Sequence, residues 1–285
     1  MSFGRSLYNG WTSVMSHWIA LSDPQRAFAY TRQREVLLSY KAASKKGPNR
    51  AWRGDNRSAD EVLLRDWKDV TARARELVQS SSHIAGALEK ICSNVIYTGI
   101  VPQAQLKKSN GVFDKVRNDA VESRFSKWAR SKKVRWFEKV KLVLRHLWQD
   151  GEILVHWFID PTMLEEGLVP LRVELLEADH FDASVHGQLR NGNYARRGIE
   201  FDATGDPVAY HLFTEHPGNC GAMLLAETRR IPADNIIHIF EPKRASQTRG
   251  ISWLYAVIMR MRDLDEYEES ERIAARLTSA FAFFL

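Results

Sequence analysis

The last 35 residues of the chain constrain its fold more than any other segment, because residues 251–285 contain neither glycine nor proline. Apolar side chains recur there at helical spacing, which predicts one long helix. At ~1.5 Å per residue this helix would be about 50 Å long. Gly250 precedes it, and Ser252 is a candidate N-cap residue. Its middle, residues 263–271, reads DLDEYEESE, so we expect the helix to pack on one side only or against copies of itself.

The charged side chains of this helix form a ladder: Arg260, Asp263, Asp265, Glu268, Glu269, Arg272 and Arg276. Glu268 and Arg272 stand four apart and can form a stabilising ion pair, whereas Arg272 and Arg276 repel each other at the same spacing. The ladder has two interpretations. It is either a solvated face with local ion pairs, or a face turned to a water-filled lumen in a ring of identical helices. Acidic groups around such a channel would repel a DNA backbone and let the DNA slide.

The preceding residues, 58–249, predict a mixed α+β domain. Helical periodicity covers 58–77, 84–95, 113–131 and 136–149, and Ser58 with Glu61 resembles a capping box at the first start. Candidate strands lie at 96–106, 152–160, 169–179, 198–214 and 235–242. The segment DATGDP, residues 202–207, lies between alternating apolar residues and indicates a hairpin turn.

Residues 1–57 form a basic arm that is rich in Arg, Lys, Ser and Gly and poor in acidic residues. Part of it lacks a sustained period and contains turn-forming residues, which predicts a partly flexible segment. The arm has two interpretations: it lies on nucleic acid or a neighbouring subunit, or it docks on its own domain. Its candidate contact residues are Arg26, Arg32, Arg34, Lys45, Lys46, Arg50 and Arg53.

Composition sets loose bounds on function. The chain carries 41 Lys and Arg against 35 Asp and Glu, a formal net charge of +6, which permits contact with nucleic acid without demanding it. Cys92 and Cys220 have no CxxC partner, which argues against a disulfide framework or a structural zinc site and favours a reducing, intracellular setting. No apolar run approaches the ~20 residues that a membrane span requires.

The sequence contains no catalytic constellation. It lacks a G-x-S-x-G elbow, a phosphate-binding glycine loop and an H-E-x-x-H pair, so we expect no enzyme activity, no cofactor and no metal. A metal-dependent hydrolase built on Asp179, His180 and His238 is a weak alternative, because a single His on a strand is more often a packed or surface residue. Cys92 lies on the apolar side of a predicted helix and is interpreted as a small core residue.

Residues 128–137 read WARSKKVRWF and mix aromatic with basic side chains. That composition is typical of a nucleic-acid surface. It is also typical of a junction between two helices in which Trp fills a core and Lys faces water. We favour the junction.

Several segments together resemble one family. The most specific is residues 231–254, IPADNIIHIFEPKRASQTRGISWL, through Pro232, Ala233, His238, Phe240, Arg244, Gln247, Arg249, Gly250 and Ser252. Others are the helix pair with Arg73, Arg75, Leu77, Asn94 and Gly99, the turn at 150–152, the strand at 171–182, the hairpin at 198–218 and the charged helix at 262–276. From about Ala27 to its end, the chain resembles the lambda-like family of tailed-phage portal proteins.

The resemblance implies a fold: an α+β portal-type wing domain, with helices and a mostly antiparallel sheet, that leads into a long stem helix. Residues 1–57 would be the arm, 58–249 the wing-like domain, and 250–285 the start of the stem. Arg244, Gln247, Arg249, Gly250 and Ser252 would form the wing–stem junction. Family members continue well beyond the position of Leu285, so clip and crown would be missing, and we expect such a fragment to assemble poorly.

The resemblance also implies a function. Portal subunits form a ring of twelve copies, the head–tail connector, at one capsid vertex, and double-stranded DNA passes through its channel during packaging and ejection. Their partners are the terminase, the major capsid and scaffold proteins, and head-completion or adaptor proteins. Their locations are the virion and, during assembly, the host cytoplasm, without a membrane. ATP hydrolysis belongs to the terminase. The alternative is a nucleic-acid-binding module that uses the basic arm.

Overall fold

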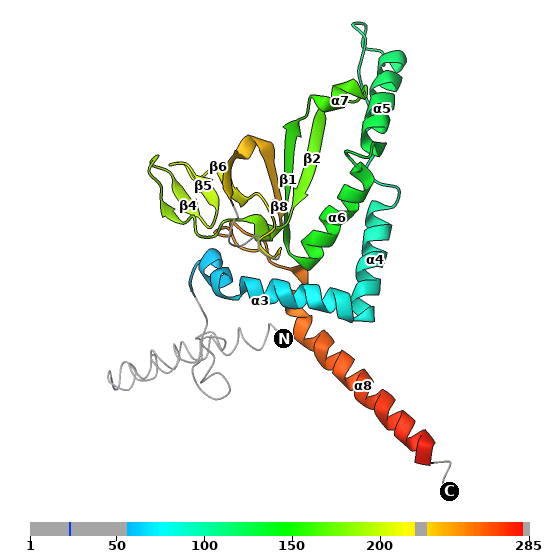
Figure 1. Cartoon of the computed structure of the whole chain (residues 1–285), viewed down its shortest axis with the longest axis vertical. Helices are drawn as coiled ribbons and strands as arrows, with labels where there is room; N and C mark the ends of the chain where they lie inside the picture. The colour runs from blue at the N-terminus through cyan, green and yellow to red at the C-terminus, as the bar shows by residue number, and fades with distance from the viewer. Residues whose placement is uncertain (1–22, 24–55, 220–226, 282–285) are drawn as a thin grey trace. The chain divides into compact units, whose positions relative to one another are not determined.

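The computed structural model describes residues 23, 56–219 and 227–281. The chain divides into two compact units, residues 1–56 and 57–285. Almost all of the first unit lies outside the described residues, and so do the candidate arm residues Arg26, Arg32, Arg34, Lys45, Lys46, Arg50 and Arg53. The second unit carries the architecture described below (Figure 1).

Helices α3 to α6 come first in the second unit and follow the predicted segments. Ser58 caps α3, because its Oγ accepts a hydrogen bond from the amide of Glu61 at 3.2 Å. A single residue, Ser81, separates α3 from α4, so the two helices meet at a corner (Figure 1). Asp114 caps α5 in the same way as Ser58 caps α3. The bounds are α3 (Ala59–Ser80), α4 (Ser82–Ile96), α5 (Lys115–Arg130) and α6 (Trp136–Gln149).

Two antiparallel sheets follow. One has the strand order β2-β1-β8, and the other has the order β3-β4-β5-β6-β7. In the first sheet β1 is central, and its Leu154 lies opposite Leu176 of β2 and His238 of β8. The strands are β1 (Glu152–Ile159), β2 (Leu171–Leu176), β3 (Gly187–Gln188), β4 (Tyr194–Arg196), β5 (Ile199–Phe201), β6 (Pro207–Phe213), β7 (Thr228–Pro232) and β8 (Ile236–Phe240).

The predicted hairpin is present between β5 and β6. The Asp202 carboxylate accepts hydrogen bonds from the amides of Thr204 and Asp206, and Gly205 adopts a φ of +93° that favours glycine. Short elements join the strands: α7 (Thr162–Glu165) and two 3₁₀ turns, η3 (Ala178–His180) and η5 (Ala233–Asn235).

Three apolar clusters hold the unit together. One joins the two sheets through Leu154, Ile199, Leu212 and Ile236. A second joins α5 and α6 to β2 and α7 around Trp128, which is 5% exposed and donates from Nε1 to the carbonyl of Leu171 at 2.7 Å. Because Trp128 fills this core, residues 128–137 form the helix junction that we favoured over a nucleic-acid surface.

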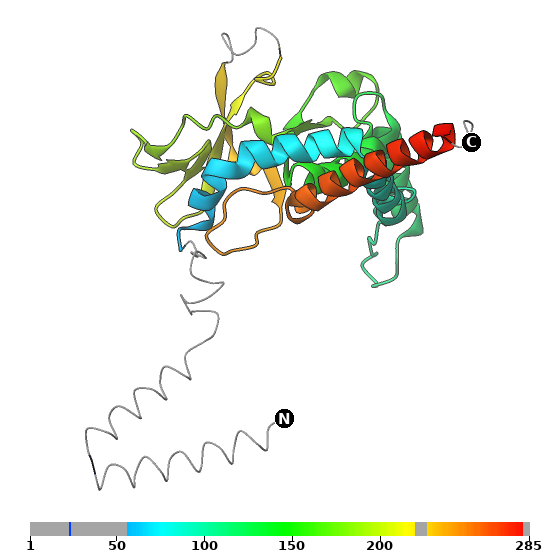
Figure 2. The same ribbon diagram turned by 90° about the horizontal axis from the view of Figure 1, so that it is seen from below.

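The third cluster joins the corner of α3 and α4 to the last helix, α8 (Ile258–Phe281). Cys92 is fully buried in it, as predicted. Leu254 in the 3₁₀ turn η6 (Trp253–Ala256) and Ile258 at the start of α8 complete it. The start of α8 lies beside α3 in both views (Figures 1 and 2). Among the described residues, no helix has both the length and the apolar content needed to cross a membrane.

The predicted fold class, α+β with mostly antiparallel sheet and a long C-terminal helix, is confirmed, but three local predictions are wrong. Residues 96–106 form no strand, because α4 continues to Ile96 and only Lys107 and Phe113 make an isolated bridge. The last helix begins at Ile258 rather than after Gly250, and Ser252 instead caps η6. The linker expected at residues 78–83 is reduced to Ser81.

Candidate functional site

The best-defined polar site is a buried ion pair between Glu152 at the start of β1 and Arg249 in the loop before α8. The Glu152 side chain is fully buried, and that of Arg249 is 8% exposed. Arg249 Nε and Nη2 donate to Glu152 Oε1 at 2.9 and 2.6 Å, and Nε is also 3.0 Å from Oε2, so the guanidinium contacts both carboxylate oxygens. A pair this deeply buried is retained only when its remaining hydrogen-bonding groups are also satisfied.

Two further donors satisfy the second oxygen of Glu152. His238 Nε2 lies 2.9 Å from Oε2, and the amide of Gly250 donates to the same oxygen at 2.7 Å. We call Glu152, His238, Arg249 and Gly250 the Glu152 cluster. Burial alone would raise the pKa of Glu152, but attraction to Arg249 and the hydrogen bond with His238 outweigh it and lower the pKa to about 2.

Aromatic rings enclose the Arg249 guanidinium. Its carbon lies 3.7 Å from the ring centre of Phe181 and 5.1 Å from that of Trp67. These rings come from the end of η3 and from α3, so the cluster brings together the first helix, the central strand and the loop before α8. Residues that the chain separates by up to 98 positions therefore contact one carboxylate.

The loop before α8 is also fastened to the start of α3. Thr248 donates from its amide and its hydroxyl to the carboxylate of Asp60, at 2.7 and 2.9 Å. Ser246 Oγ accepts from the amide of Ala59 at 3.1 Å. The first turn of α3 has unsatisfied backbone amides, and the loop satisfies one of them.

Two glycines allow the loop to approach β1 closely. A Cβ on Gly151 would lie 1.9 Å from the carbonyl carbon of Ile251, and its φ of +89° also favours glycine. A Cβ on Gly250 would lie 2.3 Å from the carbonyl oxygen of Gly151. Neither position has room for a side chain without movement of the backbone.

Of the five predicted junction residues, the structure buries four: Gln247, Arg249, Gly250 and Ser252. Gln247 Nε2 donates to the carbonyl of Arg249 at 2.7 Å, and Ser252 Oγ donates to the carbonyl of Trp148 at 3.0 Å. The side chain of Arg244 is exposed, and only its carbonyl takes part, as acceptor from the Gln247 amide.

A second charged group lies beside the Glu152 cluster and is centred on Arg75 of α3. Arg75 donates to Asp150 Oδ1 at 2.7 Å, Glu177 Oε2 at 3.1 Å and Asp179 Oδ2 at 2.6 Å. Burial would raise the pKa of Asp150, but hydrogen bonds with His146 and Arg75 lower it. Burial would lower the pKa of Arg75, yet hydrogen bonds with Asp150 and Asp179 raise it.

The charge ladder of α8 is exposed, apart from a half-buried Asp265. The remaining members are Arg260, Asp263, Glu268, Glu269, Arg272 and Arg276. The predicted pair between Glu268 and Arg272 is wrong. Arg272 instead pairs with Glu269, and Glu268 lies 3.0 Å from His83 of α4.

The residues of the metal-hydrolase alternative are engaged elsewhere. His238 bonds to Glu152, while Asp179 pairs with Arg75. Within the described part of the chain, potential metal ligands fall into two other groups, His83 with Asp265 and Glu268, and Glu177 with Asp179 and His216. Arg75 already provides a positive charge to two members of the second group.

Sequence reasoning did not find the Glu152 cluster as a unit. Glu152, His238 and Arg249 each stand in a segment that resembles the portal family, but nothing in their spacing predicts contact.

A similar cluster around Glu200 was missed entirely. The Glu200 side chain is fully buried and accepts from Arg230 Nε at 2.8 Å and from the side-chain Nδ2 groups of Asn191 and Asn193. The one available signal was a charged residue within an apolar strand, which is costly unless paired.

Comparison with known proteins identifies the family. Residues 45–285 match the model for phage portal protein, lambda family. The chain belongs to the lambda family of phage portal proteins. It is 30% identical over 268 residues to the probable portal protein of Halomonas phage phiHAP-1, covering 89% of this chain and 50% of that protein. It is 23% identical over 255 residues to the portal protein of Escherichia phage N15, covering 83% and 47%. The chain thus spans about half the length of these portal proteins.

Replacing Glu152 with Gln should destabilise this portal-family chain by about 3–5 kcal/mol, because Arg249 would stay buried without its counter-charge. Urea unfolding followed by circular dichroism measures the change. Glu266→Gln is the matched control, since it removes the partner of the exposed Arg262 and should cost less than about 1 kcal/mol. An equal loss of unfolding free energy in the two variants would contradict a special role for the buried pair.

The free energy of unfolding should also fall at low pH, because the Glu152 carboxylate becomes protonated. Its pKa is lowered from 4.5 to about 2 on folding, so its contribution is complete above pH 4.5 and disappears as the pH falls toward 2. The loss is on the order of 3 kcal/mol. Because other carboxylates titrate in the same range, the quantity to measure is the difference in unfolding free energy between wild type and Glu152→Gln. A difference that does not change from pH 5 to pH 2.5 would refute the assignment.

Gly250→Ala should destabilise the chain by about 1–3 kcal/mol, because the added methyl group overlaps the backbone at Gly151. Gly86→Ala is the control. It lies within α4 with no atom within 4 Å of the added Cβ, so it should be neutral or stabilising by up to about 1 kcal/mol. Thermal melting of both variants decides between these outcomes, and equal melting temperatures would show that the close approach is unimportant.

Proposed function

We propose that this chain is the wing and the first stem part of a portal subunit, whose copies surround a DNA channel at one capsid vertex. Membership in the lambda family of phage portal proteins is the observation that carries this proposal. Residues 58–249 correspond to the wing in this proposal, and residues 250–285 to the start of the stem. The Glu152 cluster then lies where wing and stem meet.

The surface of α8 supports assembly with further copies. Exposed large apolar side chains that the described part of the chain leaves uncovered lie just before α8, at Tyr255 and Val257, and along it, at Met259, Leu264, Tyr267, Ile273 and Leu277. In a closed ring each subunit uses two different faces, so a neighbour covers what one copy leaves exposed. The acidic run at 263–271 fits a channel that DNA passes without adhering.

The proposed role is mechanical. Double-stranded DNA would enter through the ring during packaging and leave through it during ejection. The ring, of twelve copies by family analogy, would dock the terminase, which hydrolyses ATP, and later head-completion or adaptor proteins. It would contact the major capsid and scaffold proteins in the host cytoplasm during assembly and remain in the virion at the vertex.

The complete gene product that contains this chain should form ring particles in negative-stain images, with a mass of many copies by light scattering. Ile273→Glu with Leu277→Glu should prevent ring formation, because it places charge on the exposed apolar positions of α8, while circular dichroism stays unchanged. Thr278→Glu, a change on the same exposed helix, is the control and should leave assembly intact. A complete protein that remains strictly monomeric would overturn the proposal.

A further inference from the structure

The attachment of α8 to the rest of the unit is short. We call residues 57–257 the body. Ile258 is buried against the apolar cluster of α3 and α4, and Met261 packs beside it. Every residue from 266 to 280 is exposed. The apolar attachment thus ends after about one turn of a helix that has 24 residues.

Two polar contacts continue the attachment for about two further turns. Ser81 Oγ donates to Asp265 Oδ1 at 3.2 Å, and His83 Nε2 lies 3.0 Å from Glu268 Oε1. Ser81 and His83 stand on either side of the first residue of α4, at the corner with α3. Both residues therefore reach α8 from the same point of the body.

The four attached positions of α8 lie on one face of the helix. Ile258, Met261, Asp265 and Glu268 follow one another at spacings of three, four and three, which keeps their side chains in one stripe. The stripe changes from apolar to polar where α8 leaves the core. Ser81 is 2% exposed, whereas the His83 and Glu268 side chains are 48% and 52% exposed.

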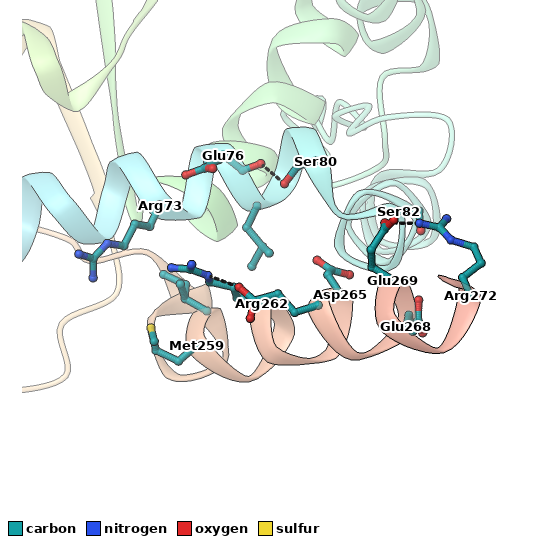
Figure 3. A pocket seen from close by; sticks show the side chains of 13 residues that line it. Arg73, Glu76, Ser80, Ser82, Met259, Arg262, Asp265, Glu268, Glu269 and Arg272 are labelled. Carbon is teal, nitrogen blue, oxygen red and sulfur yellow. Dashed lines mark hydrogen bonds and ion pairs between the residues drawn. The ribbon is translucent and has the colours of Figure 1, made fainter. Parts of the chain in front are cut away.

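The remaining charges near this stripe do not hold α8 to the body. Figure 3 shows the groove between α3 and α8, with Asp265 and Glu268 on the α8 side. Arg262 pairs with Glu266, and Arg272 pairs with Glu269, so these four side chains bond within α8 itself. The groove, about 720 Å³ in volume, is lined by residues 73–80 of α3 on one side and by residues 258–272 of α8 on the other.

We propose that Ser81 and His83 form a latch that sets the direction of α8, and that α8 exchanges between a latched and an unlatched orientation about residues 257–261. Each latch contact is a hydrogen bond, and one such contact shifts an equilibrium only a few fold, so the two together favour one orientation by about tenfold. The latch thus favours one orientation without fixing it. A second molecule that binds the far end of α8 in one orientation would shift this equilibrium.

The length of α8 amplifies small rotations. Phe281 lies about 34 Å along the helix from Ile258, so a rotation of about 10° moves that end by about 6 Å. The Glu152 cluster, by contrast, holds the loop before η6 through buried contacts with no space for adjustment. Movement is thus confined to the segment between η6 and the latch. This inference concerns the isolated chain and does not depend on the proposed portal function.

Distances between spin labels test the latch. Ser123→Cys on α5 and Thr278→Cys on α8 provide exposed labelling positions, in a Cys220→Ser background with the fully buried Cys92 retained. Labelled chain is diluted with unlabelled chain so that only distances within one molecule are recorded. We expect a narrow distance distribution for the otherwise wild-type chain and a clearly broader one after His83→Glu, because Glu268 would then face a like charge.

A charge-swapped variant separates the latch from general damage. His83→Glu with Glu268→Lys should restore the narrow distribution, and Glu271→Gln, an exposed change beyond the latch, should leave it unchanged. Melting temperatures should stay within a few degrees in all variants, since the altered side chains are exposed. The latch is overturned if His83→Glu leaves the distribution as narrow as before, or if the swapped pair fails to narrow it again.

Discussion

The rest of this structure depends on one buried ion pair, because Glu152 and Arg249 fix where the loop before α8 crosses the central strand. Removing a carboxylate and a guanidinium from water is costly, and the cost is offset only if every donor and acceptor finds a partner. Glu152 meets this condition with Arg249, His238 and the amide of Gly250. The amide can reach the carboxylate only if the loop backbone lies against β1. The glycine at 250 therefore follows from the ion pair, and the glycine at 151 follows from the same close approach together with its positive φ.

The same pair explains why the chain is held tightly up to η6 and only loosely along α8. Up to η6 the chain is held by buried hydrogen bonds, aromatic rings around Arg249 and backbone contacts too close for a Cβ. A closely packed interior is hardly compressible, so a movement of one part moves the parts packed against it. Beyond Met261 the contacts are few, and every residue from 266 to 280 is exposed. An external force or partner acting on α8 would thus first disturb the contacts of Ser81 and His83, and would leave the Glu152 cluster intact. A stiff connection followed by an adjustable one would suit the portal subunit proposed above, whose helix would have to fit beside neighbouring copies.

The sequence predicts the elements that depend on neighbouring residues, and it misses those that depend on residues far away in the chain. The β5–β6 hairpin and the cap at Ser58 involve side chains within four residues, so pattern and turn chemistry suffice. The helix start at Gly250 was misplaced because a carboxylate 98 residues away holds that backbone outside the helix. The pair of Glu268 with Arg272 failed because His83, from another helix, reaches Glu268 in the fold. Of the candidate site, four of the five predicted junction residues are buried together, but their partner Glu152 could not be identified without the sheet that places it.

The composition of α8 also follows from its exposure. A helix that packs along only its first turns must be stable largely by itself, and helices without tertiary packing are marginal unless they are long and favourably composed. The absence of glycine and proline from residues 258–281 and the pairs of Arg262 with Glu266 and Arg272 with Glu269 provide that local support. These two pairs therefore have a role in the chain by itself, since they help to keep an exposed helix folded. The apolar positions of α8, such as Ile273 and Leu277, are exposed and would be available for contact with a neighbour in the proposed portal subunit.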